Sequence, residues 1–268
     1  MLTGRNDVSF LAHWFPRYPQ FVGASSQQHG AYGQRLRRHF GFDQLEQAYK
    51  ALRGNPDTRQ VVLQIWDPAS DFPDEDGQAR ASDIPCNVIS TLKVRRGRLD
   101  WLQLVRSNDV DRGLPYNLIQ FTVLHELMAA WIGADLGTYV HVIDSAHWYM
   151  DHSDRMMIDN HVVPEESSDR INTSWDDTMS CFEILAERMD NIRQARHEHR
   201  KPELHDDRHL PQVYENIFAV IAADDARRHG EMESAQQLLG QCDNPALIQV
   251  WARWCDAVTP SALRLEVA

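Results

Sequence analysis

The chain contains 268 residues, 43% of them hydrophobic and 25% charged, which is the composition of an ordinary folded protein with one or two cores. Its formal net charge of -12 argues against nucleic acid as a partner, because a protein that binds that backbone needs clustered Lys and Arg; a small phosphate site remains compatible. The four cysteines are widely spaced, no apolar run is long enough to cross a membrane and no signal peptide is visible, so we expect a cytoplasmic, reducing location.

The first half of the chain alternates between helix-like and strand-like segments. Apolar periodicity identifies these segments, and a Gly-Asn-Pro stop ends the first of them. Arg96-Gly97 lies between two β-prone runs and predicts a hairpin turn. The predicted elements are a helix over Asp43–Arg53, strands over Gln60–Trp66, Asn87–Val94 and Leu99–Arg106, a buried helix over Phe121–Trp131 that stops at Gly133, and a strand over Thr138–Ile143.

The second half is predicted to be helical. After a loop-like stretch over Pro164–Thr173, Ser174 with Asp177 three residues later resembles a helix N-cap. The histidines between His197 and His209 fit no zinc spacing and lie in a charged run, so no metal site is predicted. We expect helices from Ser174 toward Arg196, over Leu210–His229 and from Asn244-Pro245 onward. The fold class is therefore α/β (α+β), a mixed sheet with packed helices followed by a helical C-terminal region.

An ordered set of short motifs surrounds Cys86. Taken alone, this cysteine would more often be a small buried core residue. The motifs, in chain order, are Tyr32-Gly33, Asn55-Pro56-Asp57-Thr58-Arg59, Asp83-Ile84-Pro85-Cys86-Asn87, the segment from Gln103 to Asp109, Gly113-Leu114-Pro115-Tyr116-Asn117 and His147-Trp148-Tyr149. Their order and spacing, from about Leu2 to His152, resemble the thymidylate synthase and pyrimidine-nucleotide hydroxymethylase superfamily. The resemblance implies a thymidylate synthase-like catalytic core in residues 1–160 and a divergent helical extension in residues 161–268.

The resemblance identifies Cys86 as the nucleophile. Carbon 5 of a pyrimidine becomes nucleophilic only after a thiolate has added to carbon 6, so this chemistry requires a cysteine that has lost its proton. The resemblance also implies that Arg106 lowers the pKa of this cysteine and binds the substrate phosphate, two tasks that suit a permanently charged, bidentate guanidinium. A surface salt bridge is the structural alternative for Arg106.

Other residues of the motifs would hold the substrate. The resemblance assigns Asn117 to the base, since an amide can accept from N3–H of uracil and donate to O4, whereas relatives that act on cytosine often carry Asp there. His147 and Tyr149 would bind the sugar hydroxyl, and for each of these residues a purely structural hydrogen bond is the alternative. The expected catalytic residues are Cys86, Tyr32 and Asp109, and the expected substrate-binding residues are Arg59, Arg106, Ser107, Asn108, Asn117, His147 and Tyr149.

Several positions depart from the family pattern. Gln60 stands where the family usually has a second arginine, and Asn87 replaces the histidine that often follows the nucleophile. The segment Leu2-Thr3-Gly4 matches the end of a family helix whose proton-transferring glutamate would precede Met1, so the core is expected to be N-terminally short. The ending Arg264–Ala268 follows a helical region, whereas the family's tail is rich in strands and folds over the folate.

The sequence therefore predicts transfer of a one-carbon unit from 5,10-methylenetetrahydrofolate to carbon 5 of a pyrimidine nucleoside monophosphate, uridylate being favoured, through a Cys86 adduct. A 5-hydroxymethylase of CMP, dCMP or dUMP and a non-catalytic nucleotide-binding homologue remain open as alternatives. Exclusion of water would decide between a methyl and a hydroxymethyl product, and the aromatic residues between Trp14 and Phe21 occupy the region of the family's shielding tryptophan. We expect a homodimer in which Arg59 reaches the partner's phosphate site.

Overall fold

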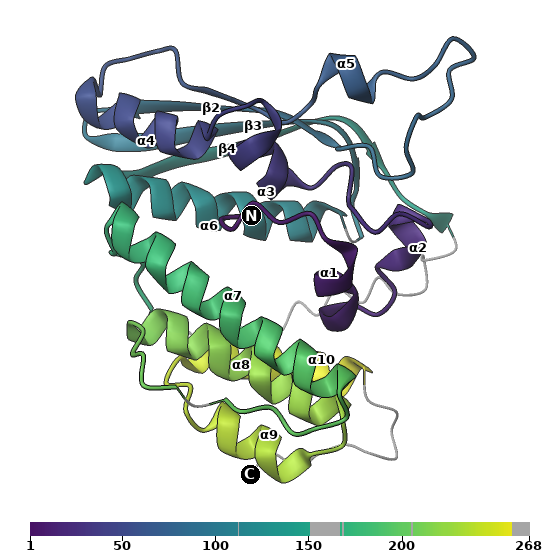
Figure 1. Ribbon diagram of the computed structural model, residues 1–268. Helices are drawn as coiled ribbons and strands as arrows, with labels where there is room; N and C mark the ends of the chain where they lie inside the picture. The colour runs from purple at the N-terminus through teal and green to yellow at the C-terminus, as the bar shows by residue number, and fades with distance from the viewer. Residues whose placement is uncertain (112, 151–166, 168, 205, 259–268) are drawn as a thin grey trace. The chain divides into compact units, whose positions relative to one another are not determined.

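The structure is a computed structural model that describes residues 1–111, 113–150, 167, 169–204 and 206–258 (Figure 1). The described residues fall into two compact units, one within 1–157 and 172–182 and the other within 158–171 and 183–268. The domain boundary predicted at residue 160 and the ending Arg264–Ala268 both lie outside the described residues.

A four-stranded sheet forms the centre of the first unit, in the order β1-β2-β3-β4. β1 pairs antiparallel with β2, β2 pairs antiparallel with β3, and β3 pairs parallel with β4. Each predicted strand is confirmed in type and place, although the first is shorter and the third and fourth are longer than predicted. The bounds are Val62–Gln64 for β1, Asn87–Arg95 for β2, Arg98–Asp109 for β3 and Asp135–His147 for β4.

The hairpin between β2 and β3 turns at the predicted dipeptide. Arg96 and Gly97 have φ angles of 54° and 75°, and a two-residue turn of the kind that matches strand twist requires positive φ at both central positions. Glycine adopts this conformation at little cost, whereas Arg96 is strained by its Cβ.

Helix α6 (Gly113–Ile132) runs along one face of the sheet and packs against β3 and β4 (Figure 1). The predicted helix over Phe121–Trp131 is only its second half, so the predicted start was wrong. Pro115 suggests a loop in sequence, but proline is tolerated in the first turn of a helix, where its missing N–H has no intrahelical partner. The early start places Asn117 within the helix, with its side chain buried.

The two faces of the sheet differ sharply in character. On the inner face, under α6, paired positions of neighbouring strands bring Ser90 beside Gln103 and Leu92 beside Trp101, and all four side chains are fully buried. The opposite face carries a row of paired residues from all four strands. This row consists of Val62, Thr91, Leu102 and Val140.

The remaining elements of the first unit surround this sheet. Helix α4 begins after Asp43, whose carboxylate accepts from the backbone N–H of Glu46, as the predicted helix requires. The sequence did not predict five shorter segments. The bounds are Gln44–Gly54 for α4, and Val8–Trp14 for α1, Pro19–Val22 for α2, Tyr32–Gln34 for α3, Arg35–His39 for the π-helical turn η1 and Pro68–Asp71 for α5.

The second unit is helical, as predicted. The N-cap of α7 is confirmed, because Ser174 accepts from the backbone N–H of Asp177 at 3.1 Å and donates to its carboxylate at 2.6 Å. From Glu183 onward α7 belongs to the second unit. The helices predicted over Leu210–His229 and from Asn244-Pro245 onward are confirmed as α8 and α10, and α9 was not predicted. The bounds are Trp175–His197 for α7, Gln212–Arg228 for α8, Met232–Leu239 for α9 and Pro245–Val258 for α10.

Candidate functional site

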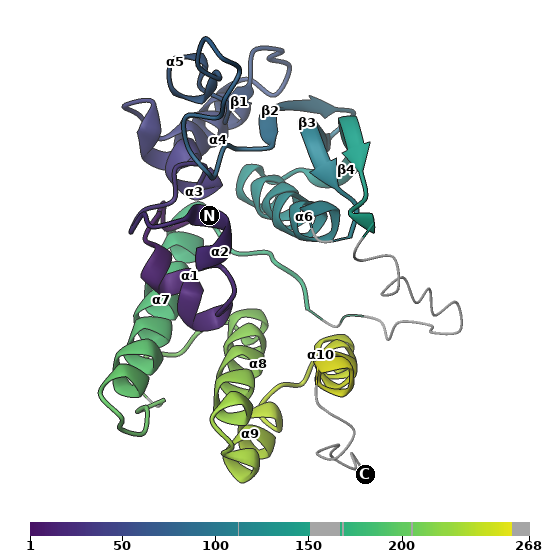
Figure 2. The same ribbon diagram turned by 90° about the vertical axis from the view of Figure 1, so that its right-hand side faces the viewer.

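The sheet topology gathers the sequence motifs at one end of the first unit. Because β2 runs antiparallel to β3, the start of β2 lies beside the end of β3, and because β4 runs parallel to β3, both strands end together. Helix α6 also begins at this end, which Figure 2 shows with the arrowheads of β3 and β4 above α6. The segments brought together are Cys86-Asn87, Arg106–Asp109, the first turns of α6 and His147.

Cys86 is held directly against Arg106. The backbone N–H of Arg106 donates to the carbonyl of Cys86 at 3.0 Å, and its guanidinium donates to the carbonyls of Pro85 at 3.0 Å and Ile84 at 3.3 Å. The guanidinium also lies over the ring of Trp66, 5.0 Å from its centre. Arg106 is therefore bound to the cysteine segment through backbone contacts and a ring contact, and a surface salt bridge does not describe it.

The half-buried Cys86 thiol has opposing electrostatic neighbours. Burial raises its pKa, the Arg106 guanidinium lowers it, and the Asp83 carboxylate raises it again. The lowering effect expected of Arg106 is present, but burial outweighs it. The thiol of the ligand-free chain therefore keeps its proton to a higher pH than an exposed cysteine, and it must lose that proton to act as a nucleophile.

A β-bulge turns Asn87 toward the core. Asn87 pairs with Val105 while Ile89 pairs with Leu104, so Val88 is an extra residue on β2. In a regular strand Asn87 and Ser90, three residues apart, would point to opposite faces. The bulge places both on the inner face, where both are fully buried.

Asn117 is buried between two other amides. Its Oδ1 accepts from Nδ2 of Asn87 at 3.0 Å, and its Nδ2 donates to Oδ1 of Asn108 at 3.1 Å. The close approach of Asn108 requires glycine at position 113, because a Cβ there would lie 2.7 Å from the Asn108 oxygen. One acceptor position and one N–H of the Asn117 amide remain for a ligand.

The ends of β3 and β4 bring the remaining polar residues together. The Ser107 hydroxyl lies 3.4 Å from Nδ1 of His147, and the rings of His147 and Tyr149 meet edge to face with centres 5.2 Å apart. The Asp109 carboxylate accepts from the backbone N–H groups of Asp111 at 3.0 Å and Gly113 at 3.3 Å. Asp109 therefore caps the connection into α6, and its catalytic role remains a prediction.

Tyr32 reaches the same end from α3. Burial raises the pKa of its phenol, the neighbouring Cys86 raises it further, and hydrogen bonding to Asn87 lowers it. Asp83, which the sequence did not single out, is close enough to both Cys86 and Tyr32 to affect the pKa of each, and burial raises its own pKa. A carboxyl three residues before a candidate nucleophile was the available sequence indication.

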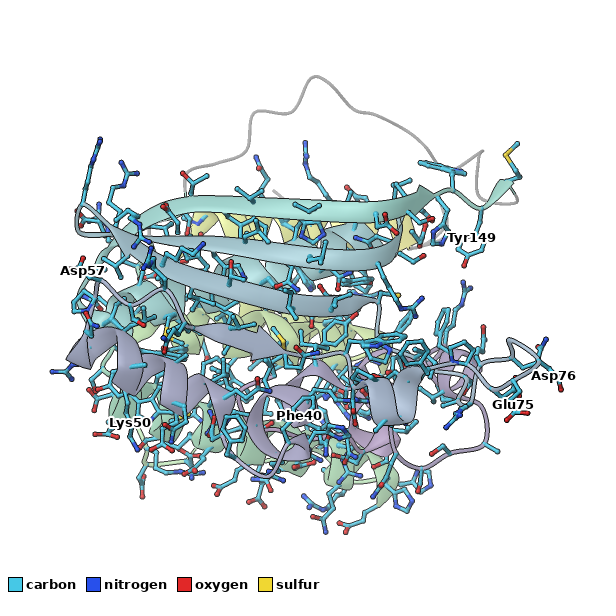
Figure 3. All side chains as sticks on the ribbon, turned by 90° about the horizontal axis from the view of Figure 1, so that it is seen from above. Phe40, Lys50, Asp57, Glu75, Asp76 and Tyr149 are labelled. Carbon is cyan, nitrogen blue, oxygen red and sulfur yellow. The ribbon has the colours of Figure 1, made fainter. Side chains whose placement is uncertain are left out.

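Arg59 is not part of this cluster. It precedes β1, where Val62 pairs with Thr91, so it lies seven strand positions from Asn87, or roughly 20 Å along the sheet. Figure 3 shows Asp57, two residues before Arg59, at the opposite end of the sheet from Tyr149. Within one chain the structure therefore separates Arg59 from the other predicted site residues.

Neither a metal-binding cluster nor a membrane-spanning helix is found in the described residues. Among the residues that the structure describes, no three His, Cys, Asp or Glu side chains are grouped as a metal ion would require. No helix in the described ranges has the length and apolar character needed to cross a membrane.

A mixed sheet, a half-buried cysteine in contact with an arginine and a buried asparagine amide meet at one sheet end, which is the arrangement of an α/β protein with a candidate cysteine-based site. The thymidylate synthase family model matches residues 2–200, and the chain belongs to this family. Curated relatives include deoxyuridylate hydroxymethyltransferases of Bacillus phage SP01, 36% identical over 56% of this chain and 41% of that protein, and of Pseudomonas phage M6, 38% identical over 56% and 42%.

A solved structure gives the same result for the fold. Thermostable thymidylate synthase A from Bacillus subtilis matches with a TM-score of 0.51 and 26% identity, over 65% of each chain. The chain spans under half the length of the two phage relatives.

Proposed function

We propose that this protein transfers a one-carbon unit to carbon 5 of a uridylate, with Cys86 as the covalent nucleophile. The observation that carries the proposal is the contact between Cys86 and Arg106 beside the buried Asn117 amide. Methylenetetrahydrofolate would supply the one-carbon unit. Family membership supports the reaction class, and the names of the curated relatives support a deoxyuridylate substrate.

Each site residue would have a role that follows from its chemistry. Cys86 adds to carbon 6, and the Arg106 guanidinium stabilises the thiolate and binds the phosphate with Ser107 and the Asn108 backbone. Burial raises the pKa of the Cys86 thiol, so its proton must pass to a base when the thiolate forms, and we assign this role to Asp83, the carboxylate that acts on the Cys86 pKa. Asn117 would recognise the base edge, while His147 and Tyr149 would bind the sugar.

Aromatic residues near the segment that precedes Cys86 offer a surface for a pterin ring. Phe15, Tyr18 and Phe21 form a cluster with ring centres 6.2–6.5 Å apart, and two of the rings are 37% and 46% exposed. Asp83 raises the pKa of Tyr18, after a larger effect of burial, so this cluster is near the cysteine segment. Flat, partly exposed rings suit stacking against a heterocycle.

The product is proposed to be the hydroxymethyl nucleotide. The two phage relatives that are named deoxyuridylate hydroxymethyltransferases, 36% and 38% identical to this chain, support this product. Partial exposure of the aromatic cluster also favours water over hydride as the second reactant, because methyl formation needs water to be excluded.

A homodimer would complete the site. On the face of the sheet away from α6, Val62, Leu102, Val140 and Val142 are 37–49% exposed, and no described helix of this unit runs along that face (Figure 1). An apolar sheet face of this kind suits a self-complementary interface. Such an interface would let Arg59, exposed and remote from its own Cys86, reach the partner's phosphate site.

The test is incubation of the chain with deoxyuridine monophosphate and carbon-13-labelled methylenetetrahydrofolate, followed by mass spectrometry of the nucleotide. We expect a labelled hydroxymethyl product and none with Cys86→Ala. A labelled methyl product would leave the reaction class intact and refute the hydroxymethyl assignment. Nucleotide binding by a folded chain that forms neither product nor a covalent Cys86 adduct would refute the enzyme and favour a binding protein.

A further inference from the structure

A continuous chain of hydrogen bonds between buried side chains connects Trp101 to Asn117. The indole N–H of Trp101 donates to Oε1 of Gln103 at 3.3 Å. Nε2 of Gln103 donates to Oδ1 of Asn87 at 2.8 Å, and Nδ2 of Asn87 donates to Oδ1 of Asn117 at 3.0 Å. The first three of these side chains are fully buried and Asn117 is 5% exposed, so bulk water cannot substitute for any link.

Each amide in this series of hydrogen bonds fixes the orientation of the next amide. The oxygen of an amide only accepts and its nitrogen only donates, so the orientation of one amide dictates that of the next. An indole N–H can only donate, and it therefore obliges Gln103 to present its oxygen to Trp101 and its nitrogen to Asn87. The hydroxyls of Ser90, which donates to the same Gln103 oxygen at 2.5 Å, and of Tyr32, next to Asn87, can donate or accept and impose no direction.

The groups on the other side of Asn117, toward Asn108, can form hydrogen bonds with either orientation of the Asn117 amide. Nδ2 of Asn108 lies 3.4 Å from Nε2 of His141, whose Nδ1 lies 2.9 Å from the Tyr139 hydroxyl. Burial lowers the pKa of His141, and a neutral imidazole can exchange its donor and acceptor nitrogens by changing tautomer. Among these described side chains, Trp101 is thus the group whose polarity cannot reverse.

We infer that Trp101, acting through Gln103 and Asn87, fixes the orientation of the Asn117 amide and thereby makes the site select uracil over cytosine. The inference rests on the proposed role of Asn117 in base recognition. Uracil presents a donor at N3 and an acceptor at position 4, whereas cytosine presents the opposite pair, so one fixed amide orientation can satisfy only one of these bases. Trp101, Gln103 and Asn87 are positioning residues, because none of them needs to touch the substrate.

The decisive variants remove the group that fixes the amide orientation and keep the fold. Trp101→Phe deletes the indole N–H and preserves an aromatic ring beside Phe121 and His125. Gln103→Leu removes the hydrogen bond to Asn87, the next in the series, and serves as an independent variant if Trp101→Phe does not fold. Ser90→Ala is the matched control, because it removes a hydrogen bond to the same Gln103 oxygen without removing the group that sets its direction.

Calorimetry with deoxyuridine and deoxycytidine monophosphates measures the preference for one base. We expect the unmodified chain to prefer the uracil nucleotide by about 10- to 100-fold, the effect of one mispaired buried hydrogen bond. In Trp101→Phe and Gln103→Leu the preference should fall to within about threefold, mostly through tighter binding of the cytosine nucleotide. Ser90→Ala should retain it. A general loss of packing would weaken both nucleotides and leave their ratio unchanged.

A rescue experiment tests the direction itself. Asn108→Asp introduces a carboxylate that can only accept, so it should hold the Asn117 nitrogen toward position 108 without help from Trp101. Added to Trp101→Phe, it should restore preference for the uracil nucleotide by about tenfold. An unchanged ratio in Trp101→Phe, Gln103→Leu and the rescued variant, with the preference of the unmodified chain intact, would overturn this inference alone. Binding of neither nucleotide by the unmodified chain would overturn the proposed function and this inference together.

Discussion

Removal of the Asp71 carboxylate from its buried ion pair with Arg35 should strongly destabilise the first unit. Both side chains are fully buried, and two guanidinium nitrogens contact the two carboxylate oxygens at 2.8 and 3.1 Å. Asp71→Ala leaves the Arg35 charge buried without its carboxylate, and breaking such a pair costs about 3–5 kcal/mol. The neighbouring Asp67, 20% exposed and paired with His39, also caps α5, so Asp67→Ala should cost about 1 kcal/mol.

Urea denaturation followed by tryptophan fluorescence measures the difference between the two variants. With an m-value of about 1–3 kcal/mol per molar urea, Asp71→Ala should lower the midpoint by roughly 1–5 M and Asp67→Ala by about 1 M or less. Asp71→Asn retains an oxygen acceptor for Arg35 and should fall between them, which keeps the comparison possible if the alanine variant does not fold. Equal midpoints for Asp71→Ala and Asp67→Ala would refute the reasoning.

Three further outcomes are expected. Asn117→Asp should weaken binding of deoxyuridine monophosphate relative to deoxycytidine monophosphate in calorimetry, and an unchanged ratio would mean that this side chain does not recognise the base. Mixing Arg59→Ala with Cys86→Ala subunits should restore part of the activity, since one pocket of a mixed dimer would carry neither defect; inactive mixtures with proven subunit exchange would place Arg59 in its own chain's site. Burial lowers the pKa of His125, whose Nε2 donates to the Leu99 carbonyl at 2.6 Å, so the neutral form's contribution to stability is complete above pH 6.5 and is lost as the pH falls below that value. The midpoint of urea unfolding should therefore fall less steeply in acid for His125→Gln, which keeps an N–H donor, than for the unmodified chain.

Local chemistry made part of the fold predictable from sequence. The hairpin at Arg96-Gly97 and the cap at Ser174 each depend on residues within a few positions of one another, and both are confirmed. The start of α6 was predicted wrongly because the prediction followed the apolar run, which begins only at Phe121, whereas the first turns of the helix carry Pro115 and polar residues. Helix α9 and the short helices near the N-terminus lack a long apolar period, so tertiary packing decides them.

The candidate site was predictable to a different degree. The motifs supplied the identities of Cys86, Arg106 and Asn117, because these residues lie in short ordered segments. The convergence of those segments follows from strand directions, which the sequence does not state. The separation of Arg59 from Cys86 also follows only once the β1–β2 register is known.

The buried amide chain lay beyond sequence analysis for a specific reason. Strand alternation places Asn87 and Ser90 on opposite faces, and only the bulge at Val88 brings both to the inner face. Without that register shift, Gln103 has no evident connection to Asn87 and Asn117. In sequence, Asn87 is a departure from the family's histidine; in the structure its amide occupies the link between Gln103 and Asn117. An amide transmits donor and acceptor direction without titrating, whereas a histidine at this position could change its protonation and tautomer near neutral pH. The links between Trp101 and Asn117 therefore contain no group that titrates near neutral pH, and His141, which contacts Asn108 on the other side of Asn117, is the histidine of this network.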